Sequence, residues 1–250
     1  MIECLTIANQ KGGVGKSTTA GALGAALSLK GYRVLYVDLD AQGNLSYSMN
    51  ATSRPLSSLE VLTGTATIEE AITKAETGDI LPASPALAGA DALVTETGKE
   101  YRLKEALETV SDKYDYCIID TPPALGVLTV NALTACNGVI IPAQADVFSI
   151  QGIGLLHQSI QAIKKYCNHG LSIKGILITR FNGRTIISQD MAQLLEDTAD
   201  RMQTRVLKAR IRECAALKEA QASQKDIFIY APKSNAAADY KAALNEIIEE

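Results

Sequence analysis

Short apolar runs rich in β-branched residues alternate along the chain with longer segments of helical periodicity. The apolar runs predict strands at Glu3–Ala8, Arg33–Asp38, Tyr116–Asp120, Gly138–Pro142 and Ile173–Thr179, with less regular ones at Asp79–Ala83 and Arg205–Ala209. The helical segments are Lys16–Leu29, Arg102–Val110, Gly152–Tyr166, Ser188–Met202 and Ala236–Glu249. This alternation predicts an α/β fold: a mostly parallel, twisted β-sheet covered by helices on both faces.

No internal repeat, low-complexity tract or Pro/Gly/Ser-rich linker divides the sequence, so we expect one domain over residues 1–250. The stretch Ala51–Gly98 has the least regular pattern, and we expect an insertion of small helices there. No apolar run approaches the roughly 20 residues of a membrane span, and the acidic start MIECLTIAN does not resemble a signal peptide.

Composition and charge exclude little. Hydrophobic residues make up 47% of the chain, charged residues 21%, and the net charge is −4. The five cysteines are scattered and form no C-x-x-C pair, which argues against a disulfide framework or a zinc site. We therefore expect a reducing, cytoplasmic setting.

The segment N-Q-K-G-G-V-G-K-S-T at residues 9–18 follows a predicted strand and opens a predicted helix, as a phosphate-binding loop does. Its glycines allow the backbone N–H groups to approach phosphates, and the helix N-terminus favours anions. Lys16 would reach the β- and γ-phosphates, and the Ser17 hydroxyl would ligate Mg²⁺. The segment thus predicts binding of ATP with Mg²⁺ by Gly12, Gly13, Val14, Gly15, Lys16, Ser17 and Thr18.

One feature departs from the pattern G-x-x-x-x-G-K-[ST]: Gln10 occupies the first glycine position, and Lys11 follows it. The alternative is a glycine turn with a chance Gly-Lys-Ser. The run K-G-G-V-G-K-S-T-T resembles the deviant Walker A loop of the ParA/MinD superfamily of P-loop ATPases. This resemblance implies a P-loop NTPase fold and a homodimer that sandwiches ATP, in which Lys11 reaches the phosphates of the other subunit. The alternative for Lys11 is a solvated loop lysine.

Two more clusters follow later strands. The first, Asp38-Leu-Asp40-Ala-Gln-Gly-Asn, resembles the family's D-x-D-P-Q-x-N switch, with Ala41 where proline is usual. This resemblance implies that Asp40 positions the attacking water and that Asp38 is structural. The alternative is that both residues only cap a loop. The second cluster is an apolar strand that ends at Asp120 and continues Thr-Pro-Pro. It resembles a Walker B strand, in which Asp120 holds Mg²⁺ through its water shell.

A fourth segment, T-R-F-N at residues 179–182, looks like the MinD-type motif that meets the adenine. The resemblance implies that Arg180 stacks on the base and Asn182 bonds its edge. A strand-end turn that uses Asn182-Gly183 is the alternative.

The remaining segments distinguish the branches of this family. The end of the chain, Tyr240–Glu250, is acidic and would be repelled by anionic lipid, which disfavours a membrane-bound MinD-like protein. No cysteine lies in Ala124–Leu128, where an iron–sulfur relative needs one.

By contrast, six Lys or Arg residues and one Glu between Arg201 and Lys218 give a local net charge of +5. This basic stretch favours non-specific binding to DNA phosphates, and a solvated helix face is the alternative. The C-terminal region resembles ParA proteins of the Soj kind, although Ala216 stands where a DNA-binding arginine is expected. The candidate DNA-binding residues are Arg184, Arg205, Lys208, Arg210, Arg212 and Lys218.

The sequence therefore predicts a ParA-type partition ATPase, cytoplasmic and nucleoid-associated. Its ATP-bound homodimer would bind DNA non-specifically, and a ParB-type centromere-binding protein would stimulate hydrolysis. The alternatives are a MinD-like positioning ATPase and an enzyme that couples ATP to amidation or cofactor chemistry.

Overall fold

A computed structural model describes residues 2–52, 54–183 and 186–248 of the chain. These residues form an eight-stranded sheet in the order β3-β4-β2-β5-β1-β6-β7-β8, in which only the β3–β4 pair is antiparallel. The strands are β1 Glu3–Ile7, β2 Val34–Asp38, β3 Thr73–Ala75, β4 Gly78–Leu81, β5 Tyr116–Asp120, β6 Gly138–Gln144, β7 Ser172–Phe181 and β8 Val206–Arg212.

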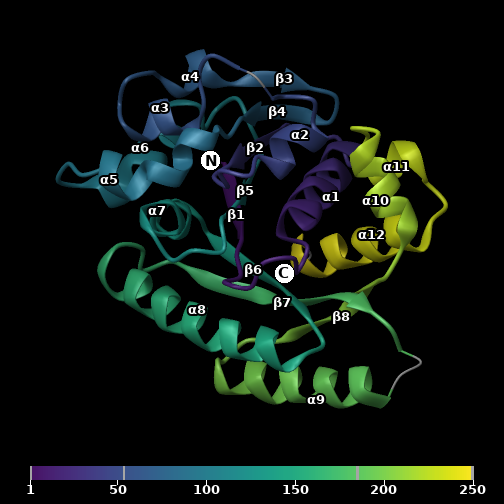
Figure 1. The fold of residues 1–250 in the computed structure, drawn as a ribbon. Coiled ribbons are helices and arrows are strands. Elements are labelled where there is room, and N and C mark those ends of the chain that lie inside the picture. Colours follow the sequence, from purple (N-terminus) through teal and green to yellow (C-terminus); the bar gives the residue numbers. More distant parts are fainter. Residues whose placement is uncertain (1, 53, 184–185, 249–250) are drawn as a thin grey trace.

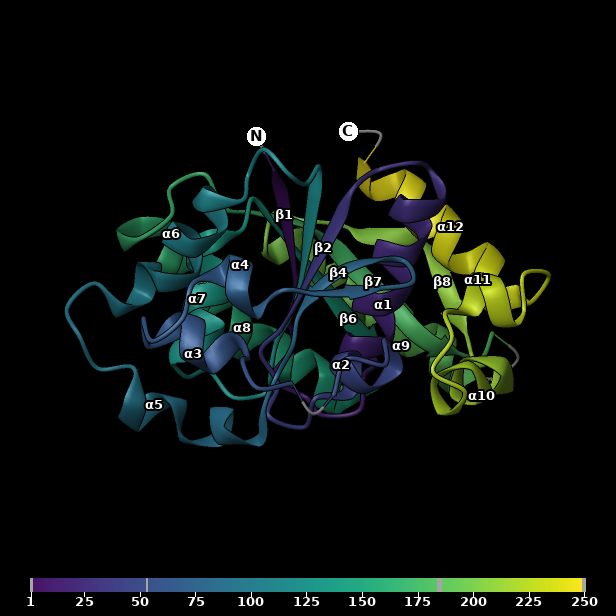
Figure 2. The same cartoon turned by 90° about the horizontal axis from the view of Figure 1, so that it is seen from above.

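Helices cover both faces of this sheet (Figures 1 and 2). They are α1 Lys16–Leu29, α2 Asn44–Ser48, α3 Ser58–Leu62, α4 Ile68–Ala71, α5 Ala90–Leu93, α6 Arg102–Thr109, α7 Val127–Ala135, α8 Val147–Tyr166, α9 Ile186–Arg201, α10 Ala215–Ala222, α11 Ile227–Tyr230 and α12 Asn235–Ile248. Two 3₁₀ turns, Pro85–Gly89 and Lys99–Tyr101, complete the described elements.

Alternate residues of each central strand enter two separate cores. Ile118 and Ile140 pack with α1 and α12 on one face, whereas Ile119 and Ile141 pack with α7 and α8 on the other. All four side chains are fully buried. Strands that are apolar on both faces therefore reflect a sheet between two helix layers, and the predicted parallel α/β fold is confirmed.

The longer elements agree with the sequence pattern, whereas the short elements α2, β3, α10 and α11 were not predicted. The small helices expected within Ala51–Gly98 are present, and α3 and α4 each begin with a capping box, at Ser57 and Thr67. Helix α8 begins at Val147, five residues before the predicted start, because the Asp146 side chain accepts from the Ser149 N–H (2.9 Å).

Helix α7 was not expected, because its sequence VLTVNALTA is apolar on nearly every side and carries no helical stripe. One domain over residues 1–250 stays a prediction. Among the described helices, none is long and apolar enough to cross a membrane.

Candidate functional site: a phosphate-binding loop and its cleft

The predicted phosphate loop joins β1 to α1 at the carboxyl ends of the parallel strands. Gly13 and Gly15 adopt left-handed conformations, with φ of +76° and +87°, that other residues rarely take. A Cβ atom on Gly12 or Gly13 would meet nothing within 4 Å. This part of the loop therefore faces open space, and its backbone is accessible to a ligand.

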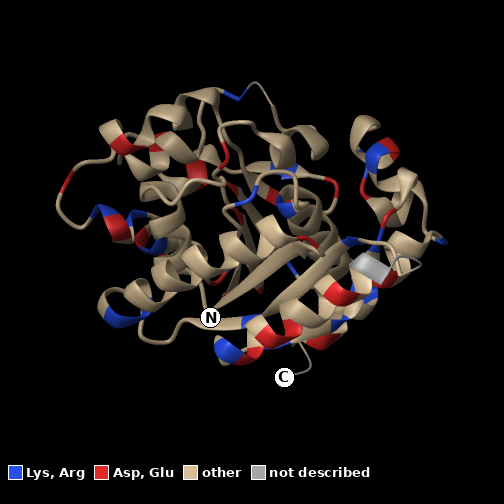
Figure 3. Ribbon diagram, turned by 60° about the horizontal axis from the view of Figure 1, so that its bottom comes forward, with Lys and Arg blue, Asp and Glu red and all other residues tan. Residues whose placement is uncertain are grey.

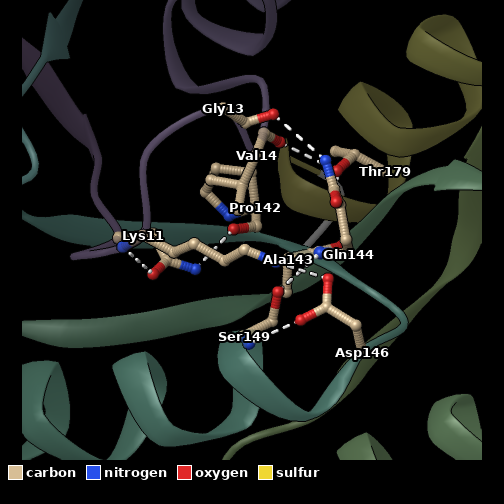
Figure 4. A network of polar contacts seen from close by, with 10 residues as sticks. Lys11, Gly13, Val14, Pro142, Ala143, Gln144, Asp146, Ser149 and Thr179 are labelled. Carbon is tan, nitrogen blue, oxygen red and sulfur yellow. Dashed lines mark hydrogen bonds and ion pairs between the residues drawn. The ribbon is translucent and has the colours of Figure 1, made fainter.

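Polar side chains from β6 and β7 hold the loop in place (Figure 4). Gln144 donates from Nε2 to the Gly13 carbonyl (3.1 Å), and the Thr179 hydroxyl donates to the Val14 carbonyl (2.8 Å). These two bonds use carbonyl groups and therefore occupy none of the loop N–H groups, which are the groups that bind phosphate oxygens. Sequence reasoning missed Gln144, although a polar residue at the end of an apolar strand was the available indication.

Lys16 lies at the centre of this arrangement. Its side chain is buried, with 7% relative exposure, and Nζ donates to the Lys11 carbonyl (3.3 Å). Burial lowers the pKa of Lys16, and the carboxyl groups of Asp120 and Asp40 oppose that shift. The ammonium group is therefore directed into the site, close to two acids.

Asp120 ends β5, and its neighbour on β2 is Asp38. Both oxygens of Asp120 are buried and have no hydrogen-bond partner among the described residues. Burial and the charge of Asp38 raise the pKa of Asp120 well above its ordinary value, although the nearby Ser17 hydroxyl and Lys16 favour the charged form. A buried carboxylate without partners is costly, and a hydrated cation beside Ser17 would satisfy it. These residues fit Mg²⁺.

The described residues contain no cluster of three or more His, Cys, Asp or Glu residues that could hold a metal ion. A cation at Ser17 and Asp120 would thus depend on oxygens of water and of a bound phosphate, as Mg²⁺ does when it accompanies a nucleotide.

The two carboxylates of the second cluster differ in their surroundings. Asp38 is fully buried and accepts three hydrogen bonds, from the Asp40 N–H (3.1 Å), the Ser46 N–H (2.8 Å) and the Ser46 hydroxyl (2.7 Å). Burial raises the pKa of Asp38 to about 6. Asp40 is partly exposed, accepts from the Gln42 N–H (3.0 Å) and lines the cleft. Asp38 therefore organises the loop that presents Asp40.

The cleft above the loop has a volume of about 730 Å³. Residues from the loop, from the Asp40 segment, from the end of β7 and from α10 surround it. They include Gly12, Gly13, Gly15, Lys16, Ser17, Thr18, Asp40, Asn44, Tyr47, Pro123, Arg180 and Gln221. The structure therefore brings together most of the predicted nucleotide-binding residues around one cavity of ligand-binding size.

Lys11 is held by its own chain. Its Nζ forms an ion pair with Asp146 Oδ2 at 2.5 Å, and the two side chains are 25% and 33% exposed. The ammonium also lies 6.0 Å from the ring centre of Phe148, an exposed residue in the first turn of α8. Figure 4 shows Lys11 extending toward the β6–α8 connection. The trans role of Lys11 stays a prediction.

The predicted adenine contacts lie at the end of β7. Arg180 is exposed, has a left-handed φ of +49°, and borders both the main cleft and a small adjoining cavity of about 60 Å³. Asn182 is also exposed. The small cavity lies between the loop and the β8–α10 connection, with Thr18, Cys214 and Tyr240 in its wall. Stacking of the base on Arg180 stays a prediction.

Some of the candidate DNA-binding residues form ion pairs within the chain. Arg212 makes a bidentate ion pair with Asp239 (2.6 and 3.0 Å). Arg210 pairs with Glu196 (3.5 Å) and stacks over Phe181. Acidic and basic positions are interspersed on the helices that come forward in Figure 3. These arginines therefore contribute to packing as well as to surface charge.

The remaining candidates differ in the same way. Arg205 donates to the backbone carbonyls of Glu246 (2.8 Å) and Lys174 (3.3 Å). Lys208 and Lys218 are exposed. Arg184 lies outside the described residues. DNA contact by any of these side chains stays a prediction.

The loop, the acids that surround Lys16 and the parallel sheet define the chain as a P-loop nucleotide-binding protein. A family model described as an AAA domain matches residues 2–173. The sporulation initiation inhibitor protein Soj of Bacillus subtilis is 38% identical over 252 residues, which cover 99% of this chain and 98% of Soj. The chain belongs to the ParA/Soj-type family of P-loop ATPases.

Two further proteins are similar over nearly the whole chain, one in sequence and one in structure. The chromosome partitioning protein ParA of Caulobacter vibrioides strain NA1000 is 36% identical, with 99% of this chain and 94% of that protein covered. A crystal structure of cobyrinic acid a,c-diamide synthase from Mycobacterium smegmatis, with a bound ATP analogue and magnesium, is 37% identical. It superposes with a TM-score of 0.86 over 98% of this chain and 93% of that chain.

Proposed function

We propose that this chain is an ATP-dependent DNA-partition ATPase that uses ATP and Mg²⁺. The observation that carries the proposal is buried Lys16, placed between an open glycine loop and the partnerless carboxylate of Asp120. The relatives named Soj and ParA support the same function.

In this proposal Lys16 and the loop N–H groups bind the β- and γ-phosphates, and Ser17 with Asp120 holds the cation. Mg²⁺, when bound, neutralises charge on the phosphates. Asp40 accepts a hydrogen bond from the attacking water, and Asp38 holds the Asp40 loop through Ser46. A bound cation would lower the raised pKa of Asp120, because the ionised form then gains a partner.

The proposed switch is a dimer. Two chains enclose two ATP molecules, and Lys11 of each chain leaves Asp146 to meet the phosphates of the other. The closed dimer combines the basic surfaces of both chains, among them the exposed Lys208 and Lys218, and binds DNA without sequence preference. Hydrolysis reopens it, stimulated by a ParB-type partner. The setting is the cytoplasm, on the nucleoid.

The decisive experiment measures ATP-dependent DNA binding. Purified protein is titrated with two unrelated duplexes in ATP, in ADP and without nucleotide, at several salt concentrations. The proposal expects binding in ATP alone, equal for both duplexes, and a steep decline with salt. Binding that is independent of nucleotide, or a flat salt dependence, would contradict it.

A second candidate function rests on the solved relative named as an amide-forming synthase. An amidating enzyme would hydrolyse ATP only when a carboxylic acid and an ammonia source are present, whereas a partition ATPase responds to DNA and its partner. A MinD-like role would require ATP-dependent binding to anionic vesicles. The apolar side of α12, including Tyr240 and Leu244, is buried, which speaks against that helix as a lipid anchor.

A further inference from the structure

Helix α10, which lies next to α1 in Figure 1, buries little of its own surface. Of its eight residues, all of which the structure describes, Ala220 alone is buried. Ala216 and Leu217 are partly buried against the core. A short helix with so small an apolar contact can shift without unpacking the core, so the polar bonds that it makes to its neighbours help to decide where it lies.

Gln221 connects α10 to the phosphate loop. Its Nε2 donates to the Thr18 hydroxyl (2.8 Å) in the first turn of α1. Thr18 follows Lys16 and Ser17 directly, and Gln221 itself borders the nucleotide cleft. A nucleotide that moves the start of α1 therefore acts on a hydrogen bond that α10 makes.

Gln224, just after the end of α10, connects the helix to the Asp40 segment. Its Nε2 donates to the Tyr47 carbonyl (2.9 Å) in α2. Helix α2 also carries Ser46, whose hydroxyl and N–H donate to Asp38 (2.7 and 2.8 Å). Because Asp38 accepts from the Asp40 N–H (3.1 Å), Gln224 ties α10 to the loop that carries the proposed water-positioning residue.

The backbone of Gln224 has a conformation that favours glycine. Helix α10 ends in a Schellman motif, in which the Gln224 N–H donates to the Gln221 carbonyl (3.1 Å) and the Lys225 N–H to the Ala220 carbonyl (3.0 Å). Gln224 takes the left-handed position of this motif, with a φ of +51°. Glycine would relieve this backbone but has no side chain to bond Tyr47, so the glutamine keeps an interaction against the local preference.

The same helix carries part of the exposed basic surface. Lys218 lies one helical turn before Gln221, and Lys225 follows Gln224 directly; both lysines are exposed. Lys218 is one of the residues proposed to meet DNA. Because the two glutamines and Lys218 belong to one short element, a shift of α10 that changes the glutamine bonds also moves this cation.

We propose that Gln221 and Gln224 are positioning residues that couple the nucleotide state to the basic surface of α10. A nucleotide that shifts the first turn of α1 or the Asp40 segment changes the bonds to Thr18 and Tyr47, and α10 follows with Lys218. The proposal rests on the proposed function for DNA as the ligand of this surface, whereas the shift of α10 requires nucleotide binding alone. By linkage, DNA must change nucleotide affinity by the same factor as nucleotide changes DNA affinity.

The first measurement is hydrogen–deuterium exchange of the amides in residues 215–225 of the full chain. The chain is saturated with ADP·Mg²⁺ or with a non-hydrolysable ATP analogue and Mg²⁺, and calorimetry establishes saturation for each variant. In the parent protein, exchange should differ between the two nucleotides by at least about 3-fold, the effect expected when one hydrogen bond is strengthened or lost. In Gln221→Met/Gln224→Gly this difference should disappear, because neither side chain can donate.

The second measurement is the affinity for a fluorescent duplex in each nucleotide, followed by anisotropy. The ratio of the two affinities should fall at least about 3-fold in Gln224→Gly, because one of the two connections is lost. Gln221→Met keeps the length of the side chain without its donor, and it covers the case in which Gln224→Gly does not fold. If the parent binds DNA in neither nucleotide, the proposed partition function is wrong, and the exchange of α10 still decides whether this helix responds to nucleotide.

Gln203→Gly is the matched control. Gln203 has the same left-handed backbone at the end of α9, with a φ of +54°. It also lies in the same motif, because the Gln203 N–H donates to the Asp200 carbonyl (3.0 Å) and the Thr204 N–H to the Ala199 carbonyl (3.0 Å). The control should keep the parent's exchange and affinity ratio. Both glycine variants should melt close to the parent, because glycine suits this backbone, so a lost response in Gln224→Gly would not reflect unfolding.

Exchange of α10 that does not distinguish the nucleotides in the parent would overturn the proposal. So would a difference that persists in the double glutamine variant, or a fall of the DNA affinity ratio in Gln203→Gly as large as that in Gln224→Gly.

Discussion

The ion pair between Lys11 and Asp146 sets a barrier to the proposed dimer. Lys11 cannot meet a phosphate of the other subunit while its Nζ lies 2.5 Å from Asp146 Oδ2. Asp146→Asn removes the charge of the partner but keeps the acceptor that caps α8 through the Ser149 N–H. We therefore predict that Asp146→Asn forms the ATP-dependent dimer more readily than the parent protein.

The magnitude follows from the exposure of the pair. Side chains that are 25% and 33% exposed are only partly screened by water, so the pair contributes roughly 0.5–1 kcal/mol. A symmetric dimer breaks it twice, which gives about 1–2 kcal/mol, or roughly a 5–30-fold change in the dimerisation constant.

Burial raises the pKa of Asp146. Hydrogen bonds from Lys11 and Ser149 lower this pKa by a larger amount, so it lies below its ordinary value. An acid whose pKa is depressed in the folded state contributes its stabilisation at neutral pH and loses it only in acid. The restraint on Lys11 is thus fully present at pH 7.

The assay is sedimentation velocity in saturating ATP, in an Asp40→Ala background that prevents turnover. Asp115→Asn is the matched control. It removes the exposed ion pair with Arg33, which lies at the amino ends of β2 and β5, whereas the phosphate loop lies at the carboxyl ends of the strands. If Asp146→Asn dimerises as the parent does or more weakly, and the control is unaffected, then the ion pair with Asp146 does not hold Lys11 back from the dimer.

Five other variants test the remaining parts of the site. Asp120→Asn should raise the melting temperature of the nucleotide-free protein, and by more as the pH rises above the ordinary pKa of a carboxyl group. The reason is that an acid whose pKa is raised in the folded state destabilises that state increasingly as pH rises; a pH-independent difference would contradict this. By calorimetry, Lys16→Ala should lose about 10–100-fold in ATP affinity, whereas Asp40→Ala should keep it and lose about 100-fold or more in turnover. Lys218→Ala should weaken binding to every DNA sequence equally and leave the free energy of unfolding unchanged. Arg212→Ala should instead lower the free energy of unfolding, because it leaves Asp239, 11% exposed, without its ion-pair partner; denaturant titration separates the effects of the two variants.

Much of the site was predictable because its chemistry is local in sequence. The loop at residues 9–18 carries its glycines, both lysines and the helix start within ten positions. Asp120 was predictable from its place after a buried strand. What joins these pieces is non-local: Thr179 reaches Val14, and Asp146 reaches Lys11, across more than 130 positions. No single-sequence pattern encodes such pairs.

The basic stretch shows the limit of reading charge from sequence. Composition counts Arg210 and Arg212 as free cations, yet the structure gives each an acidic partner from a helix, Glu196 and Asp239. Helix α7 was missed for a related reason: a helix buried on nearly all sides loses the polar stripe by which an amphipathic helix is found.

Whether Lys11 acts across an ATP-dependent dimer can be measured by light scattering. The molar mass of the parent, Lys11→Ala and Asp40→Ala is measured in saturating ATP and in ADP. We expect every protein to be a monomer in ADP. In ATP, we expect the parent and Asp40→Ala to be dimers, and Lys11→Ala to stay a monomer that still binds ATP through Lys16. Lys11→Ala that dimerises in ATP as the parent does would contradict the trans role of this lysine.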